Sequence, residues 1–214
     1  MLHRIAVFIA ASLVSITAAE AYEPKPLEVL LDQDVTYDAS IPKPEEITGF
    51  AMGEIIYTPE MHTAYVRAVA AASDRVSVEE IGRSHFGRPI LRVTTTSPDN
   101  QTRLASIRET QVGLTRAGAG AAPDDHPAII QLTHGVHGSE PSSYDAASLI
   151  LYYLAAAQGS EVEALLDEVV VHQYVMINPD GANRFAQWTN LHRANAPVAD
   201  PQHREHFYEW PWGR

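Results

Sequence analysis

The sequence predicts an α/β fold of three layers, α/β/α, in which helices cover both faces of a mixed, mostly parallel sheet. Short β-branched apolar runs alternate along the chain with longer segments whose apolar residues have helical spacing. Some runs are apolar almost throughout, such as VVVHQYVMI at 169–177, which is typical of strands buried on both faces. The pattern fades beyond Gly181 and no closing strand follows. We therefore expect a sheet domain that is incomplete at its C-terminus.

The first regular element of the domain is a helix that begins at Pro59, because proline favours the first helical position and Thr58 can cap the helix. Two strands joined by a tight turn come next, followed by a helix, a Gly/Ala-rich loop and a further strand. In chain order, the expected elements are helix 59–73, strands 76–82 and 89–97, helix 104–114, strand 128–134, helices 142–158 and 161–168, and strand 169–177.

The first 21 residues have the three parts of a secretory signal peptide. A basic start precedes an apolar stretch at 5–18, and Ala19-Glu20-Ala21 forms a small-x-small cleavage site. The apolar stretch is too short for a helix to cross roughly 30 Å of hydrocarbon. We expect removal of residues 1–21 and export to the periplasm or medium, with no membrane contact afterwards. Residues 22–48 contain four prolines and are predicted to form an extended arm.

The composition excludes several classes of protein and partner. The chain has no cysteine, so disulfides cannot stabilise it and zinc ligands must be His, Asp or Glu. Its formal net charge is −12 at pH 7. Such a charge argues against nucleic acid or an anionic membrane surface as a partner.

A loop after one of the expected strands holds two residues of the types that bind zinc. His137 offers a neutral imidazole nitrogen and Glu140 a carboxylate oxygen, three positions apart. Open α/β sheets bind ligands where strands end. Gly135 and Gly138 suit a backbone that turns sharply or approaches a ligand closely. We expect His137 and Glu140 to form half of a zinc site, and His134 to pack nearby or support them.

Other histidines fit a metal site less well. The same spacing recurs at His206 and Glu209, but a Pro- and aromatic-rich stretch without periodicity surrounds them and favours a solvated loop. His172 lies in the middle of an expected strand and is expected to be a satisfied core or sheet-face histidine. A catalytic zinc needs a third protein ligand. Only His192, His203 and His206 are available for it after Glu140, apart from His172, and none has comparable context.

Three segments, in this order, resemble motifs of the zinc carboxypeptidase family. The first, at 80–90, is similar to the family's Gly-x-Ser-x-x-Gly-Arg strand turn. The second, at 128–140, contains Gly-Val-His-Gly-Ser-Glu and resembles the metal loop. The third is Asn178-Pro-Asp-Gly181, at the end of the next central strand. Together they cover roughly residues 50–195.

The resemblance implies a zinc carboxypeptidase-like fold in which residues 49–214 form the N-terminal part of a peptidase catalytic domain. It implies that His137 and Glu140 are two of three zinc ligands. Arg193, within Asn-Leu-His-Arg, would donate to the scissile carbonyl. The family's third ligand, general base and carboxylate-binding Asn-Arg pair have no match before Arg214, so we expect the chain by itself to be inactive.

The function implied by the resemblance is zinc-dependent hydrolysis of C-terminal peptide bonds in peptides or peptidoglycan stems. Two alternatives stay open. An aspartoacylase-like zinc amide deacylase has a similar Gly-x-His-Gly-x-Glu loop, although the turn at 82–88 and the segment 178–181 favour the carboxypeptidase branch. A catalytically inactive binding domain is the other alternative.

Overall fold

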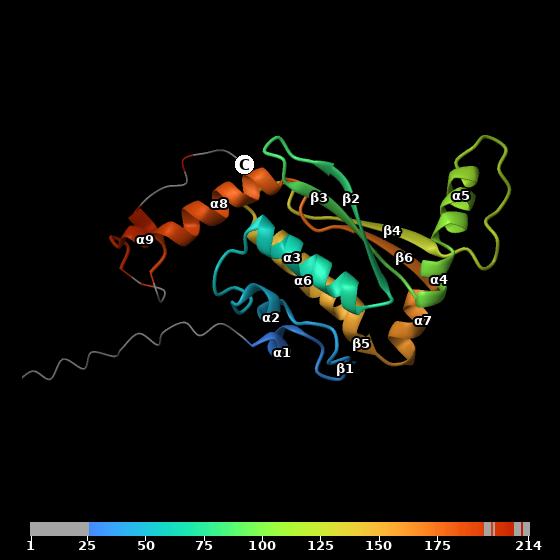
Figure 1. The fold of residues 1–214 in the computed structure, drawn as a ribbon, viewed down its shortest axis with the longest axis horizontal. Coiled ribbons are helices and arrows are strands. Elements are labelled where there is room, and N and C mark those ends of the chain that lie inside the picture. Colours follow the sequence, from blue (N-terminus) through green and yellow to red (C-terminus); the bar gives the residue numbers. More distant parts are fainter. Residues whose placement is uncertain (1–25, 195–197, 199, 208–210, 212–214) are drawn as a thin grey trace, which may run out of the picture.

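The computed structural model describes residues 26–194, 198, 200–207 and 211. The expected signal peptide at 1–21 and Glu209 lie outside the described residues. The fold is built on a four-stranded sheet of order β2-β3-β6-β4 (Figure 1). Its strands are β2 (Val76–Arg83), β3 (Pro89–Thr95), β4 (Ala128–Thr133) and β6 (Val169–Tyr174).

The sheet is mixed, as the sequence predicts, but parallel pairing does not dominate among the described residues. β2 pairs antiparallel with β3, β3 pairs antiparallel with β6, and only β4 and β6 pair in parallel. The short turn at 84–88 explains the first of these pairings, because a tight turn can join only antiparallel neighbours. The expectation of a mostly parallel sheet is wrong for this part of the chain.

Helices lie on both faces of the sheet, which confirms the three layers. α3 (Pro59–Ala72) and α6 (Pro141–Ala156) cover one face, and α5 (Leu104–Leu114) lies over one end of the other face (Figure 1). The core under the first layer joins residues of α3, α6, β2 and β3: Tyr65, Val66, Val69, Val76, Leu91, Val93, Ala147 and Leu151. α7 (Ser160–Glu168) packs through Val162 and Leu166 in a second cluster with β6. α4 (Pro98–Thr102) precedes α5.

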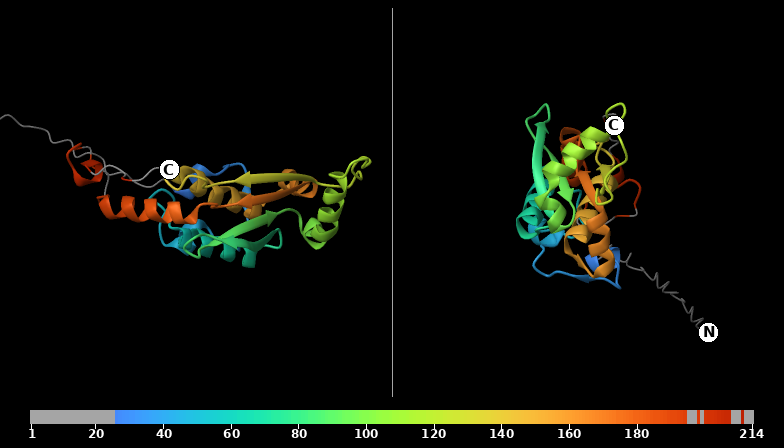
Figure 2. Two further views of the ribbon diagram at one scale, coloured as in Figure 1. Left: turned by 90° about the horizontal axis from the view of Figure 1, so that it is seen from above. Right: turned by 90° about the vertical axis from the view of Figure 1, so that its right-hand side faces the viewer.

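A helix occupies the region where the sequence pattern fades. α8 (Pro179–His192) extends beyond the end of the sheet opposite to α5 (Figures 1 and 2). Its buried side chains, apart from Pro179, are the small Ala182 and Ala186, so it shows little apolar periodicity. The short α9 (Arg204–Phe207) follows and contains His206, where the sequence favoured a loop.

The described part of the expected extended arm, residues 26–48, is partly regular and contributes to the core. It contains α1 (Leu27–Leu30), β1 (Thr36–Tyr37) and α2 (Pro44–Thr48), and β1 pairs with β5 (Ala157–Gln158). Leu27 and Ile41 are buried in the same cluster as α3 and α6. The prolines limit the length of these elements but do not keep the segment away from the domain.

β4 lies at an edge of the sheet in the described part of the chain. It was expected to be a buried strand, yet four of its six residues are exposed, and Ile130 is 39% accessible. Within the described residues only β6 pairs with it.

Among the helices of the described residues, none is long and apolar enough to cross a bilayer.

Candidate metal centre

The loop between β4 and α6 brings together the two residues predicted to bind zinc. His137 Nδ1 lies 3.1 Å from Glu140 Oε2. The His137 and Glu140 side chains are 43% and 46% exposed, so both can reach a ligand from solvent. Glu140 is the residue before α6, and Pro141 occupies the first helical position.

Two glycines give the loop its path, as their positions in the sequence suggested. Gly135 has a φ of 62°, a left-handed conformation that side chains disfavour. Gly138 lies directly against the backbone of α8, where an added Cβ would be only 2.0 Å from the carbonyl carbon of Gly181. The close approach predicted for Gly138 is therefore to protein backbone, and it fixes the loop against the first turn of α8.

Asn178 joins the loop to α8 through backbone and side chain. Its N–H donates to Gly135 O at 3.0 Å, and its Nδ2 donates to Val136 O at 3.1 Å. Its Oδ1 accepts from the N–H of Gly181 at 3.0 Å and so caps the helix. One side chain thus fixes both the metal loop and the helix beside it.

Asp180 connects the same helix to the turn between β2 and β3. Its carboxylate accepts from Ser84 Oγ and Arg88 Nη1, both at 2.9 Å, and from the N–H of Phe86 at 3.1 Å. Burial alone would raise the pKa of Asp180, but these three donors outweigh it and lower the pKa. Arg88 also donates to Glu60 on α3 at 2.9 Å.

Residues in the first turns of α6 form hydrogen bonds with the backbone of the metal loop. Ser143 Oγ accepts from the N–H of Gly135 at 3.2 Å, and the buried Tyr144 hydroxyl donates to Gly138 O at 3.2 Å. Behind Tyr144, His62 is buried with Nδ1 at 2.9 Å from Ser148 Oγ and Nε2 at 3.3 Å from Asp145 Oδ1. The loop therefore rests on polar contacts as well as on apolar packing.

The His137–Glu140 geometry fits half of a tetrahedral zinc site. Two ligand atoms that each lie about 2.0–2.1 Å from a tetrahedral zinc are about 3.3 Å apart, close to the 3.1 Å found here. In the described part of the chain, no group of three or more His, Cys, Asp or Glu residues is arranged to hold a metal. These two residues therefore fit zinc as part of a ligand set that includes a further donor.

The other histidines in the sequence have different surroundings. His134 is half-buried with its Nε2 3.5 Å from Gln173 Nε2, and burial lowers its pKa. His172 bonds Thr94 Oγ1 across the sheet at 3.0 Å, as expected for a sheet-face histidine. His192 Nδ1 is 2.7 Å from Trp188 O, and the His206 ring nitrogen bonds Val198 O.

Arg193 is not brought to the His137–Glu140 pair. Its Nη1 donates to the carbonyl of Glu54 at 2.6 Å. Arg193 directly follows α8, and the rise of an α-helix separates it from Pro179 by about 21 Å. In this structure the guanidinium fixes the end of α8 to the loop before α3.

Sequence reasoning did not identify the contacts made by Asp180, Arg88 and Ser84. All three lie within segments that resemble family motifs, but the sequence did not indicate that the turn at 84–88 contacts Asp180. The opposite charges of Asp180 and Arg88 were the one sequence feature that could have suggested the contact, because a carboxylate and a guanidinium form strong hydrogen bonds. Asn178 followed by Pro179 was also a helix-start signature that could have located α8.

Comparison with known proteins gives one family. A sequence model of that family, described as zinc carboxypeptidase, matches residues 62–211. Among solved structures, the crystal structure of thrombin activatable fibrinolysis inhibitor (TAFI) is similar over 66% of this chain and 31% of its own, with 13% identity and a TM-score of 0.43. The chain thus spans about a third of that structure's length. No curated protein matches the chain.

Proposed function

The chain belongs to the zinc carboxypeptidase family, and from this premise we propose that the full-length protein is a zinc-dependent carboxypeptidase that hydrolyses C-terminal peptide bonds. One observation carries the proposal. His137 and Glu140 lie 3.1 Å apart on a loop that contacts from Gly138, Asn178 and Tyr144 hold in place. The residue types, the separation and the rigid support are what a metal-dependent hydrolase requires.

Within this proposal, His137 and Glu140 hold Zn²⁺ together with a further donor. Zn²⁺ in such a site supplies Lewis-acid activation of water and of a substrate carbonyl. The supporting residues limit movement of the two ligands, since Asn178 and Tyr144 bond the loop backbone on either side of His137. Misplacement of ligands by about 1 Å is enough to impair a catalytic site.

Arg193 is the proposed donor to the carbonyl oxygen of the scissile bond. The support for this role is its match to the family's arginine after Asn-Pro-Asp-Gly. To fill it, the guanidinium must leave the carbonyl of Glu54, and the C-terminal end of α8 must move toward the metal loop, because the length of the helix places Arg193 about 21 Å from Pro179. Loss of one such donor lowers catalytic rates by about 100- to 1,000-fold in other hydrolases. We expect a loss of this size for Arg193→Ala and little change for Arg184→Ala, a substitution within α8 itself.

The function is tested on the full-length protein with a peptide that has a free C-terminus and the same peptide amidated. We expect stepwise release of single C-terminal amino acids from the free peptide alone, loss of release with a chelator, and recovery with Zn²⁺. His137→Ala should abolish release. His126→Ala, in the loop before β4, removes a histidine outside the proposed site and should retain it. A peptidoglycan stem peptide in the same assay tests that substrate class.

Two results would replace the proposal. Chelator-sensitive cleavage of N-acyl amino acids without peptide cleavage would assign the site to an amide deacylase. Absence of turnover on every substrate, with the protein folded and loaded with zinc, would indicate a binding domain.

A further inference from the structure

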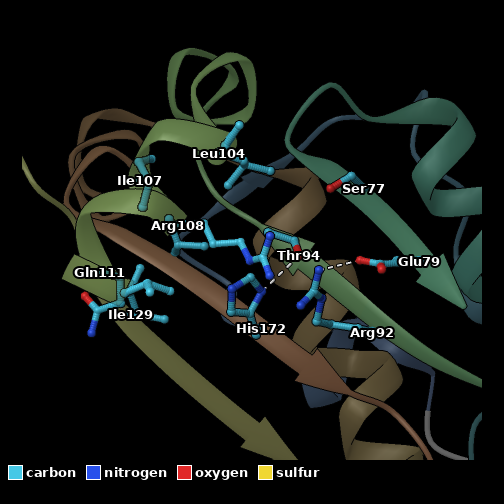
Figure 3. Close-up of a pocket in the computed structure, with 13 residues that line it drawn as sticks. Ser77, Glu79, Arg92, Thr94, Leu104, Ile107, Arg108, Gln111, Ile129 and His172 are labelled. Atoms are coloured by element: carbon cyan, nitrogen blue, oxygen red, sulfur yellow. Dashed lines mark hydrogen bonds and ion pairs between the residues drawn. The ribbon is translucent and has the colours of Figure 1, made fainter. Parts of the chain in front are cut away.

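A cavity of about 340 Å³ lies between α5 and the face of the sheet opposite to α3 and α6. Strand residues that line it, such as Arg92 and Thr94 of β3, alternate with core residues such as Val93, so they point away from the main core. The side chains of α5 close the cavity from the other side (Figure 3). It is bounded by five different elements of the chain: α5, β2, β3, β4 and β6.

Positive charge is in excess in this cavity. Arg92 pairs with Glu79, and its Nε is buried with no hydrogen-bond partner among the residues that the structure describes. Figure 3 shows Arg108 reaching from α5 toward Thr94, His172 and Arg92. In the described part of the chain, Arg108 has neither a hydrogen bond nor an ion pair. The lining thus contains two guanidinium groups and one carboxylate, in a protein whose formal net charge is −12.

His172 adds a polar group without adding charge at neutral pH. Burial lowers its pKa, and the nearby charge of Arg92 lowers it further. Its Nδ1 is 3.0 Å from Thr94 Oγ1, which leaves Nε2 as the other hydrogen-bonding nitrogen. The polar end of the cavity therefore holds cationic and neutral groups beside its single carboxylate.

The remainder of the lining is mostly apolar, and Ser77 and Gln111 are its polar members. Ile107 and Val112 of α5 lie across from Ile129 of β4 and Val170 of β6. Ile107 and Val170 are buried, whereas Val112 is 47% exposed and Ile129 partly exposed. A ligand complementary to both parts has an apolar body and an anionic end.

We propose that this cavity binds a small carboxylate with an apolar body, whose carboxylate lies between Arg108 and Arg92 and whose apolar part lies on Ile107 and Val170. Guanidinium groups suit this role because their N–H groups match carboxylate oxygens. Glu79 competes with the ligand for Arg92, so its charge weakens binding.

The cavity is distinct from the candidate metal centre. It lies along the face of the strands, at the level of Ile129 and Val170, which are paired in the sheet. The metal loop begins after Thr133, four residues further along β4, or about 13 Å at the rise of a strand. Binding in the cavity therefore does not depend on zinc.

Calorimetry on the full-length protein with hexanoate, in the presence of a chelator, tests the proposal. We expect saturable binding with a Kd on the order of 1 mM for a ligand of this size. Hexan-1-ol and inorganic phosphate should each bind at least about tenfold more weakly, because each lacks one of the two complementary parts.

Three variants distinguish hexanoate binding in the cavity from nonspecific attraction to surface charge. Arg108→Gln should weaken hexanoate binding about tenfold or more. Arg116→Gln, just after α5, removes the same charge outside the cavity and should leave the Kd unchanged. Glu79→Gln should tighten binding. Absence of saturable hexanoate binding, or equal losses for Arg108→Gln and Arg116→Gln, would overturn the proposal.

Discussion

Gly138 lies against the backbone of Gly181 with no room for a side chain. Replacing it with alanine would place a Cβ 2.0 Å from a backbone carbon, so the metal loop or α8 must move. We expect Gly138→Ala to lower the free energy of unfolding by at least about 2 kcal/mol, and to weaken zinc binding. Denaturant unfolding and metal analysis measure the two effects.

Gly113 provides the matched control. It lies in α5, and an added Cβ would meet no atom within 4 Å. Gly113→Ala should stabilise the protein by about 0.5–1 kcal/mol, because alanine favours the helix. A Gly138→Ala variant as stable as wild type would show that the contact between loop and helix is not close.

The Asp180 carboxylate should make a pH-dependent contribution to stability. Its pKa is lowered in the folded state, so its contribution is present above the ordinary value of 3.8 and is lost as pH falls through the lower folded pKa. We expect Asp180→Asn to lower the free energy of unfolding by about 1–3 kcal/mol at pH 7.

The difference between wild type and Asp180→Asn should shrink as pH falls below about 4. Urea unfolding at several pH values measures it. Asp124→Asn, at an exposed loop position, should show little difference at any pH. A difference for Asp180→Asn that does not change with pH would mean that its hydrogen bonds do not depend on charge.

Periodicity located the helices and strands from Pro59 to Tyr174 within a few residues, apart from the short α4 and β5, which were not predicted. It failed for α8, whose buried side chains are mainly alanines, and for the N-terminal segment, whose contacts come from single residues. Neither small buried alanines nor single buried residues produce an apolar repeat that can be recognised in the sequence. The exposure of β4 could not be predicted either. The apolar composition of a strand is fixed by its own residues, whereas its burial depends on the elements that cover it.

Leu27 is the residue through which α1 joins the core. It is 3% exposed, whereas Leu30 on the same helix is 44% exposed. Leu27→Ala should lower the free energy of unfolding by about 2–3 kcal/mol, and Leu30→Ala by less than about 1 kcal/mol. Thermal and denaturant unfolding of both variants measure this. Equal effects would mean that the segment is an arm independent of the domain.

Three segments that are distant in sequence meet at one junction in the folded molecule. The turn at 84–88 contacts α8 through Asp180, and Asn178 contacts the metal loop. The sequence identified each segment and the pair His137 and Glu140. It could not show that the segments touch, because contacts across such distances depend on the completed fold.

Export is a proposal for the whole protein and rests on residues 1–21. Expressed in a Gram-negative bacterial host, the protein should be found outside the cytoplasm, with its N-terminus at Tyr22. N-terminal sequencing of the purified product tests this. An intact Met1 on a cytoplasmic product would contradict it.

The zinc content of the purified protein tests whether His137 is a metal ligand. The full-length wild-type protein and the His137→Ala and His134→Ala variants are purified, checked for folding by circular dichroism, and analysed for metal per chain. We expect about one zinc per chain in wild type, almost none in His137→Ala, and most of it in His134→Ala, since His134 lies half-buried near Gln173. Equal zinc in wild type and His137→Ala would contradict the assignment of His137 as a zinc ligand.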